Sequence, residues 1–141
     1  HQVGRNDLHE VQSRYEQFGV AAEVVEFIDD MAAAYQEADL VVCRAGALTV
    51  SEVAAAGIPA IFIPFPHAVD DHQTQNARYL VEAGAARLVK QAALDVDDLA
   101  KLLRGLLSDR EALTLMGKKA LAHAKPNATA CVAEQVLAVA A

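Results

Sequence analysis

Short apolar runs alternate with longer segments of helical periodicity along the first ninety residues of the chain. Two of these runs, Leu40–Cys43 and Ala60–Ile63, contain no polar residue. Such runs are typical of parallel strands that are covered on both faces, so we expect both to be buried. Residues 24–27 and 86–90 are more mixed, and we interpret them as two further strands.

Apolar residues at three- and four-residue intervals predict helices between and after these runs. The first short helix is expected to begin after Asp29 or Asp30. In the last third, Asp95 opens a segment with a stripe of five leucines, and Ser108 and Glu111 have the spacing of a capping box. The predicted helices cover residues 7–18, 31–38, 49–56, 72–83, 95–107, 108–123 and 126–140.

Strands that alternate with helices, followed by helices alone, indicate an α/β fold: a Rossmann-like, doubly wound parallel sheet with a helical carboxyl-terminal end. A length of 141 residues fits one domain. The opening residues 1–4 resemble the tail of a strand and the turn after it, so we expect a domain that is incomplete at its amino-terminal end. Ligands of such sheets bind at the carboxyl ends of the strands, where the loops 28–31, 44–49 and 64–73 are predicted to meet.

The stretch Leu40–Glu52 combines a strand, a turn of small residues and the start of a helix expected at Thr49. The first N–H groups of a helix lack internal partners, and the helix dipole adds positive charge there. Gly46 is expected to let the backbone turn sharply and to let a ligand approach closely. A phosphate group suits this arrangement, although the stretch matches neither the dinucleotide fingerprint nor the P-loop motif.

Glu52 has two interpretations. Thr49 and Glu52 have the spacing of a capping box, in which the carboxylate bonds back to the start of the helix. Alternatively, the carboxylate accepts both hydroxyls of a ribose, as acidic residues do in nucleotide-binding folds.

The loop after the third predicted strand is dense in polar side chains, from Asp70 to Asn76. Ordinary capping by Asp70 and Gln73 is one explanation. Recognition of sugar hydroxyls by the imidazole of His72 and the amide of Gln73 is the other, because both groups donate and accept hydrogen bonds. His67 and His72 show no spacing that supports a metal site, so we predict none.

Composition excludes several classes of protein. A hydrophobic content of 54% is too high for a disordered chain, and a net charge of −7 argues against nucleic acid and anionic membranes as partners. The two cysteines, Cys43 and Cys131, are too few for a disulfide framework. Without a signal-peptide pattern or an apolar run of 18 residues, we expect a cytoplasmic protein and interpret Asn127 as a helix cap rather than a glycosylation site.

Three stretches together resemble the MurG family, the bacterial transferases that add N-acetylglucosamine to lipid I in peptidoglycan synthesis. They are Glu26–Met31, Cys43–Glu52, and the segment from Gly57-Ile58-Pro59 through Pro64-Phe65 to Gln73 and Asn76-Ala77. The resemblance extends over essentially the whole chain. Its glycine-loop and Gln-x-x-Asn pattern is shared by many two-domain GT-B transferases, whereas residues 28–31 and 44–49 are more specific.

The resemblance implies that the chain is the carboxyl-terminal, donor-binding half of a GT-B fold. It implies a UDP-N-acetylglucosamine site in which the backbone of Ile28 meets the uracil, Glu52 holds the ribose, and His72 and Gln73 meet the sugar. Loop amides near Gly46 meet the diphosphate or the sugar. The full set of implied substrate-binding residues is Ile28, Met31, Gly46, Ala47, Leu48, Thr49, Glu52, His72 and Gln73.

The implied reaction is transfer with inversion to the 4-hydroxyl of the N-acetylmuramoyl unit of lipid I, without a cofactor. The acceptor and its general base are expected on an absent amino-terminal half, so this chain alone is predicted to be inactive. The parent enzyme is expected on the cytoplasmic face of the inner membrane. Val3 and His72 depart from the residues often found in the family, a small hydroxyl residue and Gln.

Two other functions stay open. One is a different GT-B enzyme that uses a UDP-sugar, such as a lipid glucosyltransferase or a 2-epimerase. The other is a non-enzymatic α/β binding module, whose loops contain nothing more than capped helices.

Overall fold

A computed structural model describes residues 1–67 and 69–140 of the chain. Ala68, in the predicted polar loop, and Ala141 lie outside the described residues. The chain forms two compact units, His1–Gln36 and Glu37–Ala141, and each is described by itself.

The first unit contains the helix α1 (Leu8–Gln17) and most of α2 (Met31–Glu37). The predicted strand at residues 24–27 is reduced to one parallel bridge between Gln2 and Val25. Asp30 rather than Asp29 caps α2, because its Oδ1 accepts the N–H of Ala33 at 2.9 Å. The two candidate caps are thereby distinguished.

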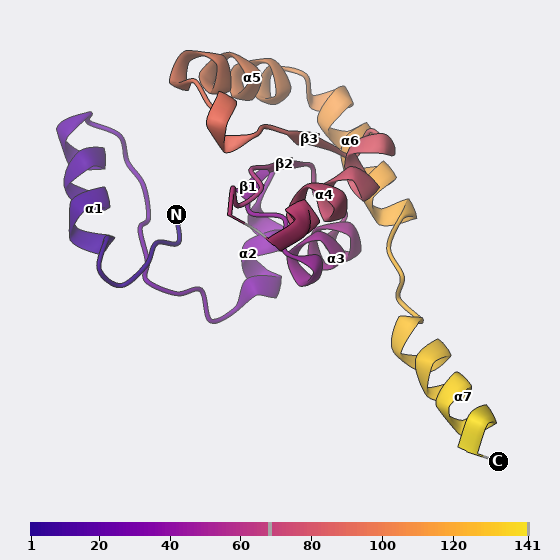
Figure 1. Ribbon diagram of the computed structural model, residues 1–141. Helices are drawn as coiled ribbons and strands as arrows, with labels where there is room; N and C mark the ends of the chain where they lie inside the picture. Colours follow the sequence, from indigo (N-terminus) through magenta and orange to yellow (C-terminus); the bar gives the residue numbers. More distant parts are fainter. Residues whose placement is uncertain (68, 141) are drawn as a thin grey trace. The chain divides into compact units, whose positions relative to one another are not determined.

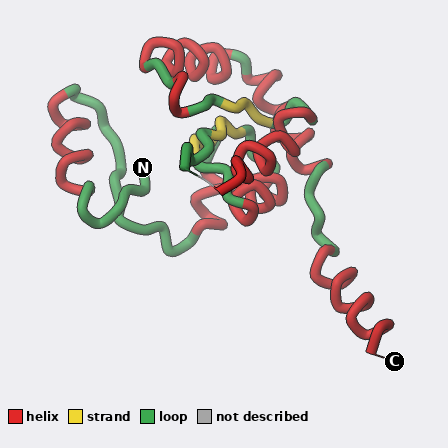
Figure 2. The backbone as a smooth tube through the Cα atoms, in the orientation of Figure 1, coloured by secondary structure: helices red, strands yellow, loops and turns green. Residues whose placement is uncertain are grey.

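The second unit is built on a parallel sheet of three strands in the order β1-β2-β3 (Figures 1 and 2). The strands are β1 (Val41–Cys43), β2 (Ala60–Phe62) and β3 (Ala86–Leu88). Val42 pairs with Ile61, and Ile61 pairs with Arg87. The three predicted strands and their parallel direction are confirmed.

The two apolar strands differ in burial. Every residue of the central strand β2 is buried, as expected. In β1, however, Val42 is 45% exposed, so the expectation of cover on both faces is wrong for this strand. The reason is position: β1 lies at one edge of the described three-stranded sheet, whereas β2 is central. An apolar run does not reveal which strand is central.

Helices lie on both sides of the sheet. Ile61 packs with Leu106 of α5 (Val96–Ser108) and with Leu113 and Met116 of α6 (Arg110–Ala122). Because side chains alternate along a strand, Ala60 and Phe62 point the other way. Figure 1 shows α3 (Ala47–Ala56) and α4 (His72–Glu82) on that side. The doubly wound architecture is therefore confirmed.

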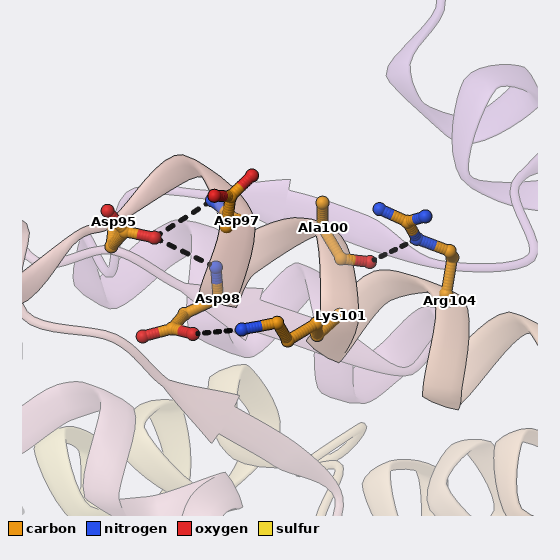
Figure 3. A network of polar contacts seen from close by, with 6 residues as sticks. All are labelled: Asp95, Asp97, Asp98, Ala100, Lys101 and Arg104. Carbon is orange, nitrogen blue, oxygen red and sulfur yellow. Dashed lines mark hydrogen bonds and ion pairs between the residues drawn. The ribbon is translucent and has the colours of Figure 1, made fainter.

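Aspartates cap the helices α5 and α6. Oδ1 of Asp95 accepts the N–H groups of Asp97 and Asp98 at 2.9 and 3.1 Å, as Figure 3 shows for the start of α5. At α6 the cap is Asp109, whose Oδ1 accepts the N–H of Ala112 at 2.9 Å. The predicted capping box of Ser108 is wrong, because Ser108 ends α5 and its hydroxyl donates back to the oxygen of Gly105.

The carboxyl end of α3 lies against α6. Gly57 ends α3 in the left-handed conformation (φ 68°), as predicted. A methyl group on Gly117 of α6 would lie 2.5 Å from the carbonyl oxygen of Gly57, so only glycine permits this approach. The last helix, α7 (Ala128–Ala140), begins directly after Asn127. Within the described residues no helix is both long and apolar enough to span a membrane.

Candidate functional site

Helix α3 begins directly after the edge strand, at the carboxyl end of the sheet. Its first residue is Ala47, and the N–H of Val50 closes the first turn on the oxygen of Gly46 at 2.9 Å. Thr49 is therefore the third residue of the helix and not its cap, so the predicted capping box of Thr49 is wrong. Gly46 has no side chain with which to accept the first N–H groups, and these groups start the helix without an intrahelical partner.

Of the two roles predicted for Gly46, the sharp turn is wrong, whereas the close approach of a ligand stays a prediction. Its φ of −62° and ψ of 149° are extended values that any residue adopts, so glycine is not needed for the turn. A methyl group here would lie 3.6 Å from Oγ1 of Thr49, an ordinary contact. What the glycine provides is open space beside the N–H groups of the helix start, through which a ligand can approach.

Glu52 is the sixth residue of α3 and its side chain is exposed. It lies four residues after Leu48, so both side chains project from the same side of the helix. At a rise of about 1.5 Å per residue, Glu52 stands roughly 7.5 Å along the axis from Ala47. The carboxylate is therefore near the open helix start but does not fill the position of its cap.

Gln73, the second residue of α4, binds two loops at once. Its Oε1 accepts the N–H of Phe65 at 2.9 Å and the N–H of Ala45 at 3.3 Å. The predicted box of Asp70 with Gln73 is wrong, since Asp71 precedes α4 and accepts from Thr74 Oγ1 at 2.6 Å. Two backbone donors fix the orientation of the Gln73 amide, so its NH₂ group is the end left to face a ligand.

The turn before α4 has an unusual backbone. Asp70 and Asp71 both have left-handed conformations, with φ of 52° and 53°. Such angles are strained for residues other than glycine, although aspartate tolerates them better than most. The turn leads into His72, the exposed first residue of α4. Seven predicted residues, from Gly46 to Gln73, thus lie on two helix starts that Gln73 joins.

Arg44, which the sequence analysis did not single out, also ties the loops together. Its Nη1 donates to the carbonyl oxygens of Ile63 and Pro64 at 3.1 and 3.2 Å and to Oε1 of Gln91 at 2.8 Å. Its guanidinium lies 5.6 Å from the centre of the Phe65 ring. One cation therefore joins the segments that follow all three strands. Two signals in the sequence pointed to it: its place directly after an apolar strand, and its place in the family-specific stretch 44–49.

Ile28 and Met31, the other two predicted site residues, belong to the first unit. Ile28 lies in the loop before α2, and Met31 is the first residue of that helix; both are half-buried. Their proposed contact with a base stays a prediction.

Two further features bear on the chemistry. Burial raises the pKa of the Cys43 thiol to about 11, so the thiol is neutral at physiological pH and is a poor nucleophile. Among the described residues, no group of three or more His, Cys, Asp or Glu is arranged to hold a metal ion. The open start of α3 is suited to binding an anion.

A hollow of about 460 Å³ lies elsewhere, at the amino ends of the strands. It is lined by residues such as Asp39, Pro59 and Lys118. The side chains described above lie at the opposite ends of the strands, so this hollow is not part of their site.

Comparison with known proteins gives three consistent matches. The family model of the glycosyltransferase family 28 C-terminal domain matches residues 1–132. A Shewanella sp. (strain MR-4) protein, named UDP-N-acetylglucosamine–N-acetylmuramyl-(pentapeptide) pyrophosphoryl-undecaprenol N-acetylglucosamine transferase, is 56% identical over 99% of this chain and 39% of its own length. The protein of the same name from Cupriavidus metallidurans is 57% identical over 95% of the chain and 37% of its own length.

Solved structures agree. The crystal structure of Acinetobacter baumannii MurG has a TM-score of 0.90 and 46% identity, over 97% of this chain and 40% of that one. A glycotransferase of kitacinnamycin has a TM-score of 0.61 at 23% identity over 95% of this chain, which shows a shared fold alone. The chain thus spans about 40% of the length of these relatives.

Proposed function

Since the chain belongs to the family of glycosyltransferase family 28 C-terminal domains, we propose that it is the donor-binding part of an inverting N-acetylglucosaminyltransferase. The proposed reaction moves N-acetylglucosamine from UDP to lipid I in peptidoglycan synthesis. The observation that carries the proposal is the open start of α3, which Gln73 holds beside the start of α4.

The diphosphate is the part of the donor that suits the start of α3. The N–H groups of Ala47, Leu48 and Thr49 and the helix dipole favour an anion there. Arg44 adds a positive charge at the same edge of the sheet, in a chain whose net charge is −7. During transfer these groups stabilise the charge that develops on the leaving diphosphate.

The ribose of the donor is assigned to Glu52. A carboxylate near the anion site offers two acceptor oxygens to the two hydroxyls of a ribose. The backbone at Ile28, with Met31 beside it, is assigned to the uracil.

The sugar is assigned to His72 and Gln73. Because the oxygen of Gln73 is engaged by two backbone donors, its amide can only donate to the ligand. A Gln73→Ala change would therefore release both loops as well as the sugar. Gln73→Glu keeps an acceptor for the loops, removes the donor and adds a negative charge. The charge should weaken both ligands through the diphosphate that they share, and the lost donor should weaken UDP-N-acetylglucosamine further. An equal loss of both ligands would contradict the sugar assignment.

Acceptor and base are assigned to a part of the enzyme outside these 141 residues. Transfer needs an acceptor hydroxyl about 3–3.5 Å from the anomeric carbon and a base beside it. Nothing at the carboxyl ends of these strands is proposed as that base, so the chain alone should not transfer sugar. The name of the relatives contains pyrophosphoryl-undecaprenol, a membrane lipid, so we propose that the reaction takes place at the cytoplasmic membrane surface.

Calorimetric titration of UDP, UDP-N-acetylglucosamine and UDP-glucose into the chain tests the proposal. We expect UDP and UDP-N-acetylglucosamine to compete for one site and UDP-glucose to bind more weakly. A preference for UDP-glucose would favour a lipid glucosyltransferase, and no affinity for any of the three would favour a plain binding module. Transfer of labelled sugar to a lipid I analogue by the chain alone would show that the base is on this half.

A further inference from the structure

Asn76 lies one helical turn after Gln73, and both side chains bind the same backbone residue. Nδ2 of Asn76 donates to the carbonyl oxygen of Ala45 at 3.1 Å, and Oε1 of Gln73 accepts the N–H of Ala45 at 3.3 Å. Ala45 is fully buried and directly precedes Gly46. Both backbone polar groups of the residue that leads into α3 are thus satisfied by side chains of α4.

The bond from Asn76 fixes more than one atom. The carbonyl of Ala45 and the N–H of Gly46 belong to one planar peptide group, and no peptide in the described chain is cis. In a trans peptide these two groups point to opposite sides. Holding the oxygen of Ala45 toward α4 therefore turns the N–H of Gly46 away from α4 and sets the direction in which the helix starts.

We infer that Asn76 is a positioning residue of the donor site, which acts on the diphosphate through the Ala45–Gly46 peptide. The inference rests on the proposed function, since it takes the ligand at the start of α3 to be a diphosphate. It gives the last residue of the Gln-x-x-Asn pattern a role that is distinct from sugar recognition. In this proposal the NH₂ group of Gln73 donates to the sugar, whereas the NH₂ group of Asn76 donates to the oxygen of Ala45 in the loop.

Two substitutions separate this role from general stability. Asn76→Ala leaves the buried oxygen of Ala45 without its donor. Asn76→Asp keeps the size of the side chain but places an oxygen against that oxygen. Gln75→Ala is the matched control, because Gln75 is an exposed amide on the same helix and its Oε1 accepts from Nη1 of Arg78, at 3.4 Å, rather than from the loop.

The experiment has a readout without ligand and one with it. Hydrogen exchange of the unliganded chain, followed by NMR, should be faster at Ala45 and Val50 in both Asn76 variants and unchanged in α6. Calorimetry should show that UDP and UDP-N-acetylglucosamine are weakened by the same factor, roughly fivefold for the loss of one hydrogen bond. The Gln75→Ala variant should match the unaltered chain in both measurements.

Two outcomes would overturn the inference. Unchanged exchange at Ala45 and Val50 would show that Asn76 does not hold the loop. A loss of UDP-N-acetylglucosamine affinity with UDP affinity intact would make Asn76 a sugar contact. If the unaltered chain binds neither nucleotide, the proposed function fails, while the exchange measurement still decides whether Asn76 positions the peptide.

Discussion

Helices α3 and α5 begin in opposite ways. At α5 the carboxylate of Asp95 occupies two of the first N–H groups (Figure 3). At α3 the same position is held by Gly46, which has no side chain. Replacing an aspartate cap by glycine costs a helix only a few tenths of a kcal/mol. The comparison indicates that leaving a helix start open costs little stability, so stability alone does not reveal which helix start could serve a ligand.

The largest expected effect comes from closing α3 in the manner of α5. Gly46→Asp fits the backbone, since φ is −62° and a new Cβ would make only an ordinary contact. The carboxylate should accept the first N–H groups and repel a diphosphate. Loss of charge-assisted bonds worth about 1.5–3 kcal/mol should weaken UDP by more than tenfold, with melting temperature unchanged or raised. Calorimetry measures the affinity for UDP, and thermal melting measures the melting temperature.

Gly46→Ala is the control for this change, because it adds bulk without charge and should weaken UDP less. Equal affinity of the Gly46→Asp variant and the unaltered chain would mean that the ligand does not bind at the start of α3.

A smaller effect is expected when the charge on α3 is removed. Glu52→Gln turns charge-assisted bonds to a ribose into neutral ones, a loss of about 1–2 kcal/mol in UDP affinity. Stability should hardly change, because Glu52 is exposed and lies beyond the first turn. Glu111→Gln, in the first turn of α6, makes the same change in net charge and should leave UDP affinity intact. Similar UDP affinities for both variants would remove Glu52 from the ribose site.

Removing the cap of α5 should have the opposite effect: lower stability with unchanged UDP affinity. Asp95→Ala removes the cap and should lower the free energy of unfolding by about 1 kcal/mol, without an effect on UDP. Asp97→Ala, which removes a neighbouring charge but no cap, serves as the control. Chemical denaturation measures the free energy of unfolding, and calorimetry measures the affinity for UDP. A change in UDP affinity for Asp95→Ala would show that the two helix starts are not independent.

The last expected effect concerns the strand that leads into α3 and appears only at high pH. Burial raises the pKa of Cys43 from 9.0 to about 11. Between these values the unfolded chain loses the proton first, so this thiol's contribution to stability is complete below pH 9 and is lost as the pH rises toward 11. Above pH 9, the free energy of unfolding, measured by chemical denaturation, should therefore fall more steeply with pH for the unaltered chain than for Cys43→Ala. Cys131→Ala, at an exposed site, should leave the slope unchanged.

The sequence was sufficient to predict the strands of the sheet but not the residues at which the helices begin. The apolar runs located all three strands of the second unit, and Gly57 and Asp95 mark helix ends as expected. Three proposed capping boxes failed because another residue took the cap position: Gly46, three residues before Thr49, and the adjacent Asp71 and Asp109 in place of Asp70 and Ser108. The local sequence pattern does not decide which of several nearby residues caps a helix when tertiary packing sets where the helix begins.

The loop contacts of the candidate site could not be predicted from the sequence, for another reason. Arg44 reaches Gln91, 47 residues away, and Asn76 reaches Ala45, 31 residues away. No local periodicity encodes such pairs. The resemblance to known transferases identified which residue types meet there, and only the structure shows that Gln73 and Asn76 bind the protein's own backbone.

The contact of Gly117 with Gly57 anchors α3 at the end that lies away from the candidate ligand. With its far end fixed against α6, the helix presents its first N–H groups already in place. Ordering a residue on binding costs about 1–2 kcal/mol of conformational entropy, and a preorganised helix avoids that cost. Bulk added at Gly117 would therefore loosen the opposite end of α3 and make nucleotide binding entropically less favourable, at a site that Gly117 itself never touches.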